Sequence, residues 1–138
     1  MNLVIDTNIL ISALIRNSLT RELIIKLPVD LLLPEFELLE IKKHKQEILR
    51  KSKLSEIEFD HLLNFLLEYV EIIKTEDIID YKKEADEIIN HIDPDDVQFV
   101  ATALKYNVAI WSDDKHFQKQ NKIKIFTTKD ILEFLEVF

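Results

Sequence analysis

The chain has 138 residues and contains neither cysteine nor glycine. The missing cysteines exclude disulfides, thiolate zinc sites and thiol nucleophiles, and the missing glycines exclude the glycine-rich loops that bring backbone close to phosphate. The formal net charge of −8, from 26 acidic against 18 basic residues, argues against a protein that coats nucleic acid with its whole surface.

Short apolar runs alternate with longer amphipathic stretches along the chain. In chain order, the expected elements are strand 3–6, helices 7–16 and 19–27, strand 31–33, helices 35–51 and 55–68, strand 70–74, helices 76–91 and 95–106, strands 109–111 and 123–126, and helix 128–137. The apolar residues of the strands are consecutive rather than alternating, which is typical of strands covered on both faces. This order predicts a three-layer α/β/α fold around a mostly parallel five-stranded sheet.

Helix starts are marked at two places in the sequence. Ser55 and Glu58 form a capping-box pattern, and Thr127 or Thr128 precedes the last apolar stretch. No apolar run approaches the roughly 18 residues of a membrane span, and the first residues do not resemble a secretory signal. We therefore expect a single cytoplasmic domain over residues 1–138.

Acidic residues follow two of the expected strands and open one of the expected helices. Asp6 ends the first strand, Asp113 and Asp114 follow the run Ala-Ile-Trp-Ser, and Asp95 and Asp96 open the helix at 95. In open parallel sheets, ligands bind beyond the carboxyl ends of the strands. We expect these carboxylates to converge at that edge.

A further acid is expected from helix 35–51. Glu40 borders the apolar face of that helix and can reach a crevice, whereas Glu37 is expected to face solvent. Converging carboxylates without basic partners cannot all stay ionised without a cation, and an all-oxygen ligand set favours Mg²⁺ or Mn²⁺. Such ions serve phosphodiester hydrolysis. Taken singly, each Asp also suits a helix cap or a turn, so the joint pattern carries the argument.

Three segments resemble the PIN domains, a family that includes the VapC-type toxins. They are VIDTNILISAL, PEFELLEIKKHK and DPDDVQFVATALKYNVAIWSDDKHF, and together they span nearly the whole chain. The resemblance implies a metal-dependent nuclease that acts on RNA, and it leaves open whether Glu40 or a neighbouring Glu is the second acidic ligand. By position, the implied catalytic and metal-binding residues are Asp6, Glu40, Asp96 and Asp114. The implied auxiliary residues are Asn8, Ser112, Asp113 and Asp93.

A basic segment, residues 42–53, follows Glu40 directly and offers a place for RNA phosphates. A solvated helix face explains the same segment equally well. The expected RNA-binding residues are Lys42, Lys43, Lys45 and Lys115.

The leading hypothesis is an Mg²⁺- or Mn²⁺-dependent endoribonuclease, the toxin of a toxin–antitoxin pair. The resemblance implies an antitoxin partner and a homodimer. The alternative is a catalytically inactive PIN-like module that binds RNA or protein, although all four quartet positions are acidic. A haloacid-dehalogenase-like phosphatase would need Asp where Asn8 stands.

Overall fold

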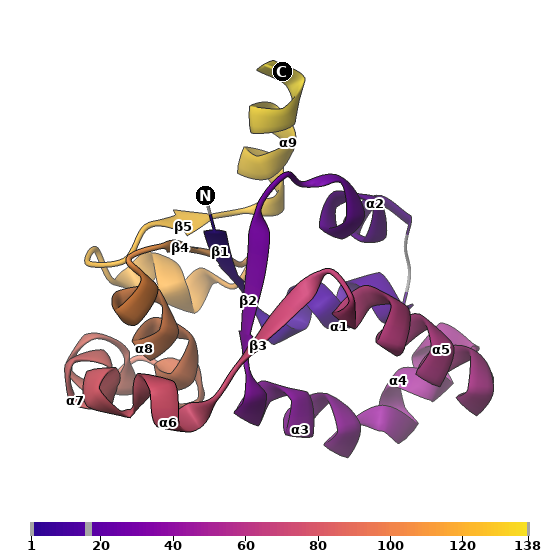
Figure 1. The fold of residues 1–138 in the computed structure, drawn as a ribbon, viewed down its shortest axis with the longest axis horizontal. Helices are drawn as coiled ribbons and strands as arrows, with labels where there is room; N and C mark the ends of the chain where they lie inside the picture. The colour runs from indigo at the N-terminus through magenta and orange to yellow at the C-terminus, as the bar shows by residue number, and fades with distance from the viewer. Residues whose placement is uncertain (1, 16–17, 138) are drawn as a thin grey trace.

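Five parallel strands form one sheet in the order β3–β2–β1–β4–β5 (Figure 1). The computed structural model describes residues 2–15 and 18–137, so Arg16, the expected end of the first helix, lies outside the described residues. The strands are β1 (Asn2–Ile5), β2 (Asp30–Pro34), β3 (Val70–Ile73), β4 (Ala109–Trp111) and β5 (Ile125–Phe126). This sheet, with helices on both sides, confirms the predicted three-layer α/β/α fold.

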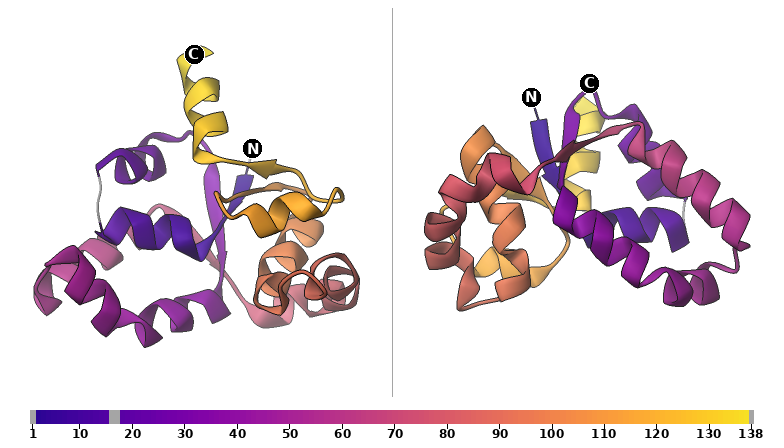
Figure 2. Two further views of the ribbon diagram at one scale, coloured as in Figure 1. Left: turned by 180° about the vertical axis from the view of Figure 1, so that it is seen from behind. Right: turned by 60° about the horizontal axis from the view of Figure 1, so that its bottom comes forward.

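The helices form two groups, one on each side of the sheet. The first group is α1 (Thr7–Ile15), α2 (Ser18–Lys26), α3 (Glu35–Lys43), α4 (Lys45–Ser52) and α5 (Glu56–Leu67). The second is α6 (Thr75–Ile78), α7 (Lys82–Ala85) and α8 (Val97–Tyr106), and α9 (Thr128–Val137) projects from the rest of the chain (Figures 1 and 2). No helix within the described residues combines the length and the apolar character needed to cross a bilayer.

Strand β1 lies in the middle of the sheet and sets the position of the site. Leu3, Val4 and Ile5 are buried, as expected for a strand covered on both faces. Ile5 is in register with Trp111 of β4, and the backbone N–H of Asp6 donates to the Trp111 carbonyl at 3.0 Å. The residues that follow, Asp6 and Ser112, therefore leave the sheet side by side.

Both predicted helix starts are present with their caps. Ser55 and Glu58 exchange side-chain and backbone hydrogen bonds of 3.0 and 3.1 Å at the start of α5. At the start of α9, Thr127 rather than Thr128 is the capping residue. Its hydroxyl accepts from the Asp130 N–H at 3.1 Å, and the Asp130 carboxylate accepts from the Thr127 N–H at 2.9 Å.

The helix expected over 35–51 is two helices that meet at His44. No proline or glycine lies in this stretch, so the break comes from tertiary contacts. Ile48 is buried in the core, and the Lys45 ammonium binds Glu56 at 2.9 Å and Asp60 at 3.0 Å on α5. These contacts turn α4 away from the axis of α3.

The helix expected over 76–91 is divided into four short pieces. Between and after α6 and α7 lie η1, a 3-10 turn (Ile79–Tyr81), and η2, a π-helical turn (Asp86–Asn90). All four pieces contact α8 or the segments beside it, and Ile78, Ala85 and Ile89 are buried there. The segment bends to keep these residues on the core, which no local sequence signal marked.

Two further differences lie near the last strand. Strand β5 begins at Ile125 rather than at residue 123. The Gln120 side chain binds both the N–H and the carbonyl of Ile123 at 2.8 and 2.9 Å, and the Lys124 carbonyl accepts from the Ile110 N–H at 3.0 Å. Two 3-10 turns, η3 (Pro94–Asp96) and η4 (Lys115–Lys119), stand where the sequence predicted a helix start and no element. Asp95 and Asp96 of η3, and Asp114, which caps η4, line the pocket described next.

Candidate active site

A polar pocket of about 430 Å³ opens where the first strand ends and helix α1 begins. Helices α1 and α3, the turn η3 and the start of η4 surround it. Its basic lining residues are Lys43 and His44. The acidic residues that line it are Asp6, Glu37, Glu40, Asp93, Asp95, Asp96 and Asp114. The predicted convergence of Asp6, Asp96 and Asp114 is therefore present, and Glu40 lines the same pocket.

Asp6 is held at the bottom of this pocket by two donors. Its side chain is 3% exposed; Oδ2 accepts from the Ser112 hydroxyl at 2.6 Å, and Oδ1 accepts from the Asn8 N–H at 3.3 Å. Burial raises the pKa of Asp6, the Ser112 hydrogen bond opposes that rise, and the nearby charges of Asp114 and Asp113 add to it.

Ser112 also forms a hydrogen bond with the segment that carries Asp114. It is fully buried, and its hydroxyl oxygen accepts from the Asp114 N–H at 2.9 Å. Asp114 in turn accepts from the His116 N–H at 2.9 Å, which starts the turn η4. Ser112, the position expected to be auxiliary, therefore binds the carboxylate of Asp6 and the backbone of Asp114.

Asp96 carries a buried carboxylate oxygen that lacks a protein partner. The residue is 7% exposed, and Oδ2 has no hydrogen-bond partner among the described residues. Burial, followed by the charges of Asp93 and Asp6, raises the pKa of Asp96 to about 8.

The expectation that Glu37 faces solvent is wrong. Glu37 is 5% exposed; its Oε2 accepts from the Thr7 hydroxyl at 3.1 Å, and its Oε1 has no partner within the described chain. Burial raises its pKa to about 7, partly opposed by Thr7, and the charges of Glu40 and Asp6 contribute. Glu37 lies in the first turn of α3, directly after a buried strand, and that turn faces the end of β1. Its spacing of one helical turn from Glu40 was the available signal.

Glu40 lies nearer the rim than Glu37. Its side chain is 34% exposed, and its Oε2 is 3.7 Å from His44 Nε2. Helix α3 therefore presents both Glu37 and Glu40 to the pocket. Glu37, which the helical pattern predicted to face solvent, is the more buried of the two.

Asp113 and Asp114 point to different parts of the structure. The Asp113 carboxylate accepts from the Thr128 N–H and the Thr128 hydroxyl, both at 2.7 Å, so it anchors the start of α9. The pocket contains Asp114 and not Asp113. Asp113 still contributes negative charge to the environment of Asp6.

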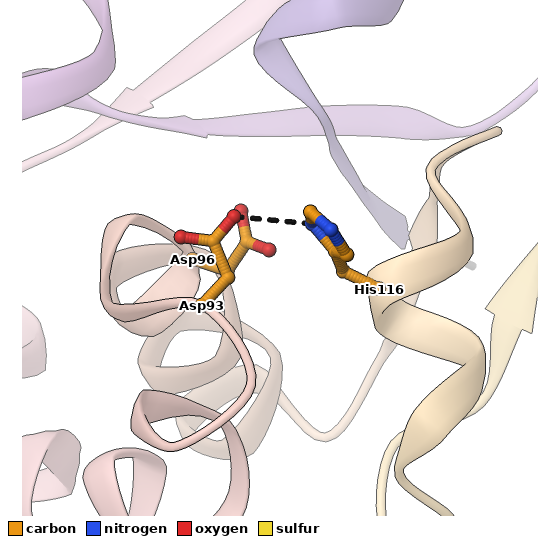
Figure 3. A group of neighbouring side chains, drawn as sticks. All are labelled: Asp93, Asp96 and His116. Atoms are coloured by element: carbon orange, nitrogen blue, oxygen red, sulfur yellow. Dashed lines mark ion pairs between the residues drawn. The ribbon is translucent and has the colours of Figure 1, made fainter.

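Asp93 and His116 face one another at one side of the pocket (Figure 3). His116 Nδ1 is 3.2 Å from Asp93 Oδ2 and 3.3 Å from Asp114 Oδ1. Asp93 Oδ1 accepts from the Asp95 N–H at 2.9 Å, which caps η3. The family resemblance implies an auxiliary role for Asp93 and does not include His116 among the ligands.

The four lysines expected to bind RNA have different surroundings. Lys43 lines the pocket, and Lys42 and Lys115 are exposed outside it. Lys45 is engaged by Glu56 and Asp60, and its ammonium lies 5.5 Å from the centre of the Phe59 ring. These contacts tie α4 to α5. The RNA contacts expected of the four lysines stay predictions.

The donor set of the pocket fits a divalent cation. Buried carboxylates are costly unless they are paired or bind a metal, and the unpaired oxygens of Asp96 and Glu37 are of this kind. Carboxylate oxygens are the donors preferred by Mg²⁺ and Mn²⁺. The residues that could hold such an ion are Asp6, Glu37, Glu40, Asp96 and Asp114.

Fold and site together define an α/β/α domain with an acidic pocket at the carboxyl ends of a parallel sheet. A family model described as PIN domain matches residues 4–135, and the chain belongs to the PIN-domain family. Among solved structures, it is similar to a chain in the crystal structure of VapBC2 from Rickettsia felis bound to a DNA fragment from its promoter. The identity is 15% and the TM-score 0.70, over 92% of this chain and 98% of that one. A comparison with curated proteins gave no match.

Proposed function

We propose that this PIN domain is an Mg²⁺- or Mn²⁺-dependent endoribonuclease and the toxin of a toxin–antitoxin pair. One observation carries the proposal: buried carboxylates, two of which have an oxygen without a hydrogen-bond partner among the described residues, meet at the carboxyl end of the sheet in a pocket open to solvent. Asp96 and Glu37 supply the unpaired oxygens, and Asp6 lies beside them. A structural cap would need neither burial nor an unpaired oxygen.

The roles proposed for the acids follow from their burial. Asp6, Asp96 and Asp114 would hold the ion, and α3 would complete the set through Glu37 or Glu40. The chemistry supplied by such an ion is polarisation of the phosphodiester and activation of a water molecule. Ser112 would orient the Asp6 carboxylate directly and fix the backbone of Asp114 through its second hydrogen bond.

The basic residues near the pocket would hold the RNA backbone. Lys43 lies in the pocket lining beside the acids, where its charge can meet a phosphate next to the scissile one. Exposed Lys42 and Lys115 would extend this path, and Asn8, which also lines the pocket, offers an amide to the substrate.

The proposed partner is an antitoxin protein. The support is the likeness to the VapBC2 structure, which is reported in complex with promoter DNA. A homodimer and a cytoplasmic location are proposed on the family resemblance.

Cleavage of a single-stranded RNA tests the proposal. The purified protein should cut internally with Mg²⁺ or Mn²⁺ and be inactive in EDTA, and Asp6→Asn should abolish cutting. Asp80→Asn, an exposed acid on η1, serves as the matched control and should retain activity. Cleavage that persists in EDTA, or survives Asp6→Asn, would overturn the metal mechanism.

A further inference from the structure

Three side chains at one side of the acidic pocket form a mixed nitrogen and oxygen cluster (Figure 3). Asp93, Asp96 and His116 each present one ligand atom, and these atoms all lie within 4.8 Å of one another. That spacing suits three ligands around a single ion, because ligands each about 2 Å from a metal lie roughly 3–4 Å apart.

The backbone holds the cluster in place from two sides. Asp93 uses Oδ1 to cap η3 and leaves Oδ2 facing His116. Phe117, next to His116, is buried and packs edge to face on Phe99 of α8, with ring centres 6.2 Å apart. Since Phe99 lies one turn after Asp96, this aromatic contact fixes the distance between η4 and the Asp96 carboxylate.

An ion pair alone does not account for the cluster. His116 Nδ1 is buried and lies 3.2 Å from Asp93 Oδ2 and 3.3 Å from Asp114 Oδ1, but among the described residues it forms no hydrogen bond of acceptable geometry. Asp96 is more than nine-tenths buried, and its Oδ2 also has no partner in the described chain. Two unsatisfied buried ligand atoms, one nitrogen and one oxygen, face the same small space.

Such a ligand set favours a different ion from an all-carboxylate site. Imidazole nitrogen binds the divalent transition metals well, whereas Mg²⁺ prefers oxygen donors alone. Mn²⁺ accepts both kinds of ligand.

We propose that Asp93, Asp96 and His116 bind a divalent transition-metal ion, with Mn²⁺ as the test ion, through a direct imidazole nitrogen ligand. The proposal rests on the proposed function only in that Asp96 belongs to both sites. It assigns the domain a transition-metal preference and gives His116 a ligand role that the all-acid quartet omits.

Pulsed electron paramagnetic resonance of the Mn²⁺-loaded protein tests this directly. We expect ¹⁴N modulation from a coordinated imidazole, and uniform ¹⁵N-histidine labelling of the unaltered protein should replace it with ¹⁵N modulation. His116→Gln should abolish the signal and weaken Mn²⁺ binding at least about tenfold, while Mg²⁺ binding changes little. His44→Gln is the control, because His44 lines the same pocket and should leave the signal intact.

The outcomes separate this inference from the proposed function. Bound Mn²⁺ without nitrogen modulation, or modulation that survives His116→Gln, overturns the His116 ligand and leaves the nuclease proposal standing. Nitrogen modulation in a protein that cuts no RNA supports the metal site and contradicts the nuclease. Failure to bind Mn²⁺ overturns the mixed-ligand site, whereas the nuclease proposal is then decided by RNA cleavage in Mg²⁺.

Discussion

Ser112 donates a 2.6 Å hydrogen bond to Asp6, a residue 106 positions away in the sequence. The same hydroxyl oxygen accepts from the Asp114 N–H, so one buried serine links the acid after β1 to the acid after β4. This link exists because β1 and β4 are adjacent and in register, with Ile5 opposite Trp111.

Replacing this serine should therefore damage both fold and site. Ser112→Ala leaves Asp6 Oδ2 without its donor and the Asp114 N–H without its acceptor, which should lower the free energy of unfolding by about 1–3 kcal/mol. It should also weaken binding of Mn²⁺. Urea unfolding and a metal titration measure the two effects. Ser12→Ala, at an exposed position on α1, should change neither, and equal behaviour of the two variants would contradict the linking role.

The stability of the metal-free protein should fall as the pH rises from about 5 to 8. The pKa of Glu37 is raised to about 7 and that of Asp96 to about 8, whereas both groups in an unfolded chain titrate near 4. In this window the folded state holds more protons than the unfolded state, so the free energy of unfolding decreases with pH. For Glu37 the loss is at most about 3 kcal/mol.

Urea unfolding in EDTA across this window measures the slope. Glu37→Gln should reduce it, because the amide does not titrate, and saturating Mg²⁺ should flatten it by binding the ionised carboxylates. A stability that stays constant or rises between pH 5 and 8 in EDTA would show that these two acids are not buried as described.

Neutralising a buried acid should stabilise the metal-free protein. In EDTA, Asp6→Asn and Asp96→Asn should each raise the melting temperature, because Asn replaces a buried acid whose ionised form is poorly solvated and repelled by its neighbours. Mg²⁺ at 100 times its dissociation constant should stabilise the unaltered protein by about 2.7 kcal/mol. Both variants should lose most of that gain, and Asp80→Asn should retain it. Variants that respond fully to Mg²⁺ would separate these acids from the ion site.

Neighbouring lysines on α3 and α4 should behave differently toward RNA. Lys43→Ala should weaken RNA binding and reduce the slope of log K against log salt by about 0.7, the value for one phosphate contact on a single strand. Lys45→Ala should leave that slope unchanged and lower the melting temperature, because Lys45 bridges to Glu56 and Asp60. The opposite pattern would assign the phosphate contact to Lys45.

The architecture could be predicted because its signals are local. Consecutive apolar residues mark the buried strands, and Ser55 and Thr127 mark helix starts with side chains that cap them. The convergence of Asp6 and Asp114 follows from strand order, since β1 and β4 are neighbours.

The features that escaped prediction depend on contacts between distant segments. The helix break at His44 is accompanied by ion pairs between Lys45 and residues of α5. The buried Glu37 carboxylate accepts a hydrogen bond from Thr7, thirty positions earlier in the chain. His116 is absent from the predicted ligand set because the acids alone suffice for a cation site. The sequence does not show that Phe117 packs on Phe99 and brings the imidazole close to Asp96.

The two hydrogen bonds from Thr128 to Asp113 connect the C-terminal helix α9 to the segment that carries Asp114. Asp113 anchors α9, and the next residue, Asp114, lines the pocket, so a single peptide unit separates the helix anchor from the acid. We expect any fusion tag or bound protein that displaces α9 to shift the backbone that presents Asp114. Binding of another protein to α9 could therefore change the position of Asp114 in the pocket.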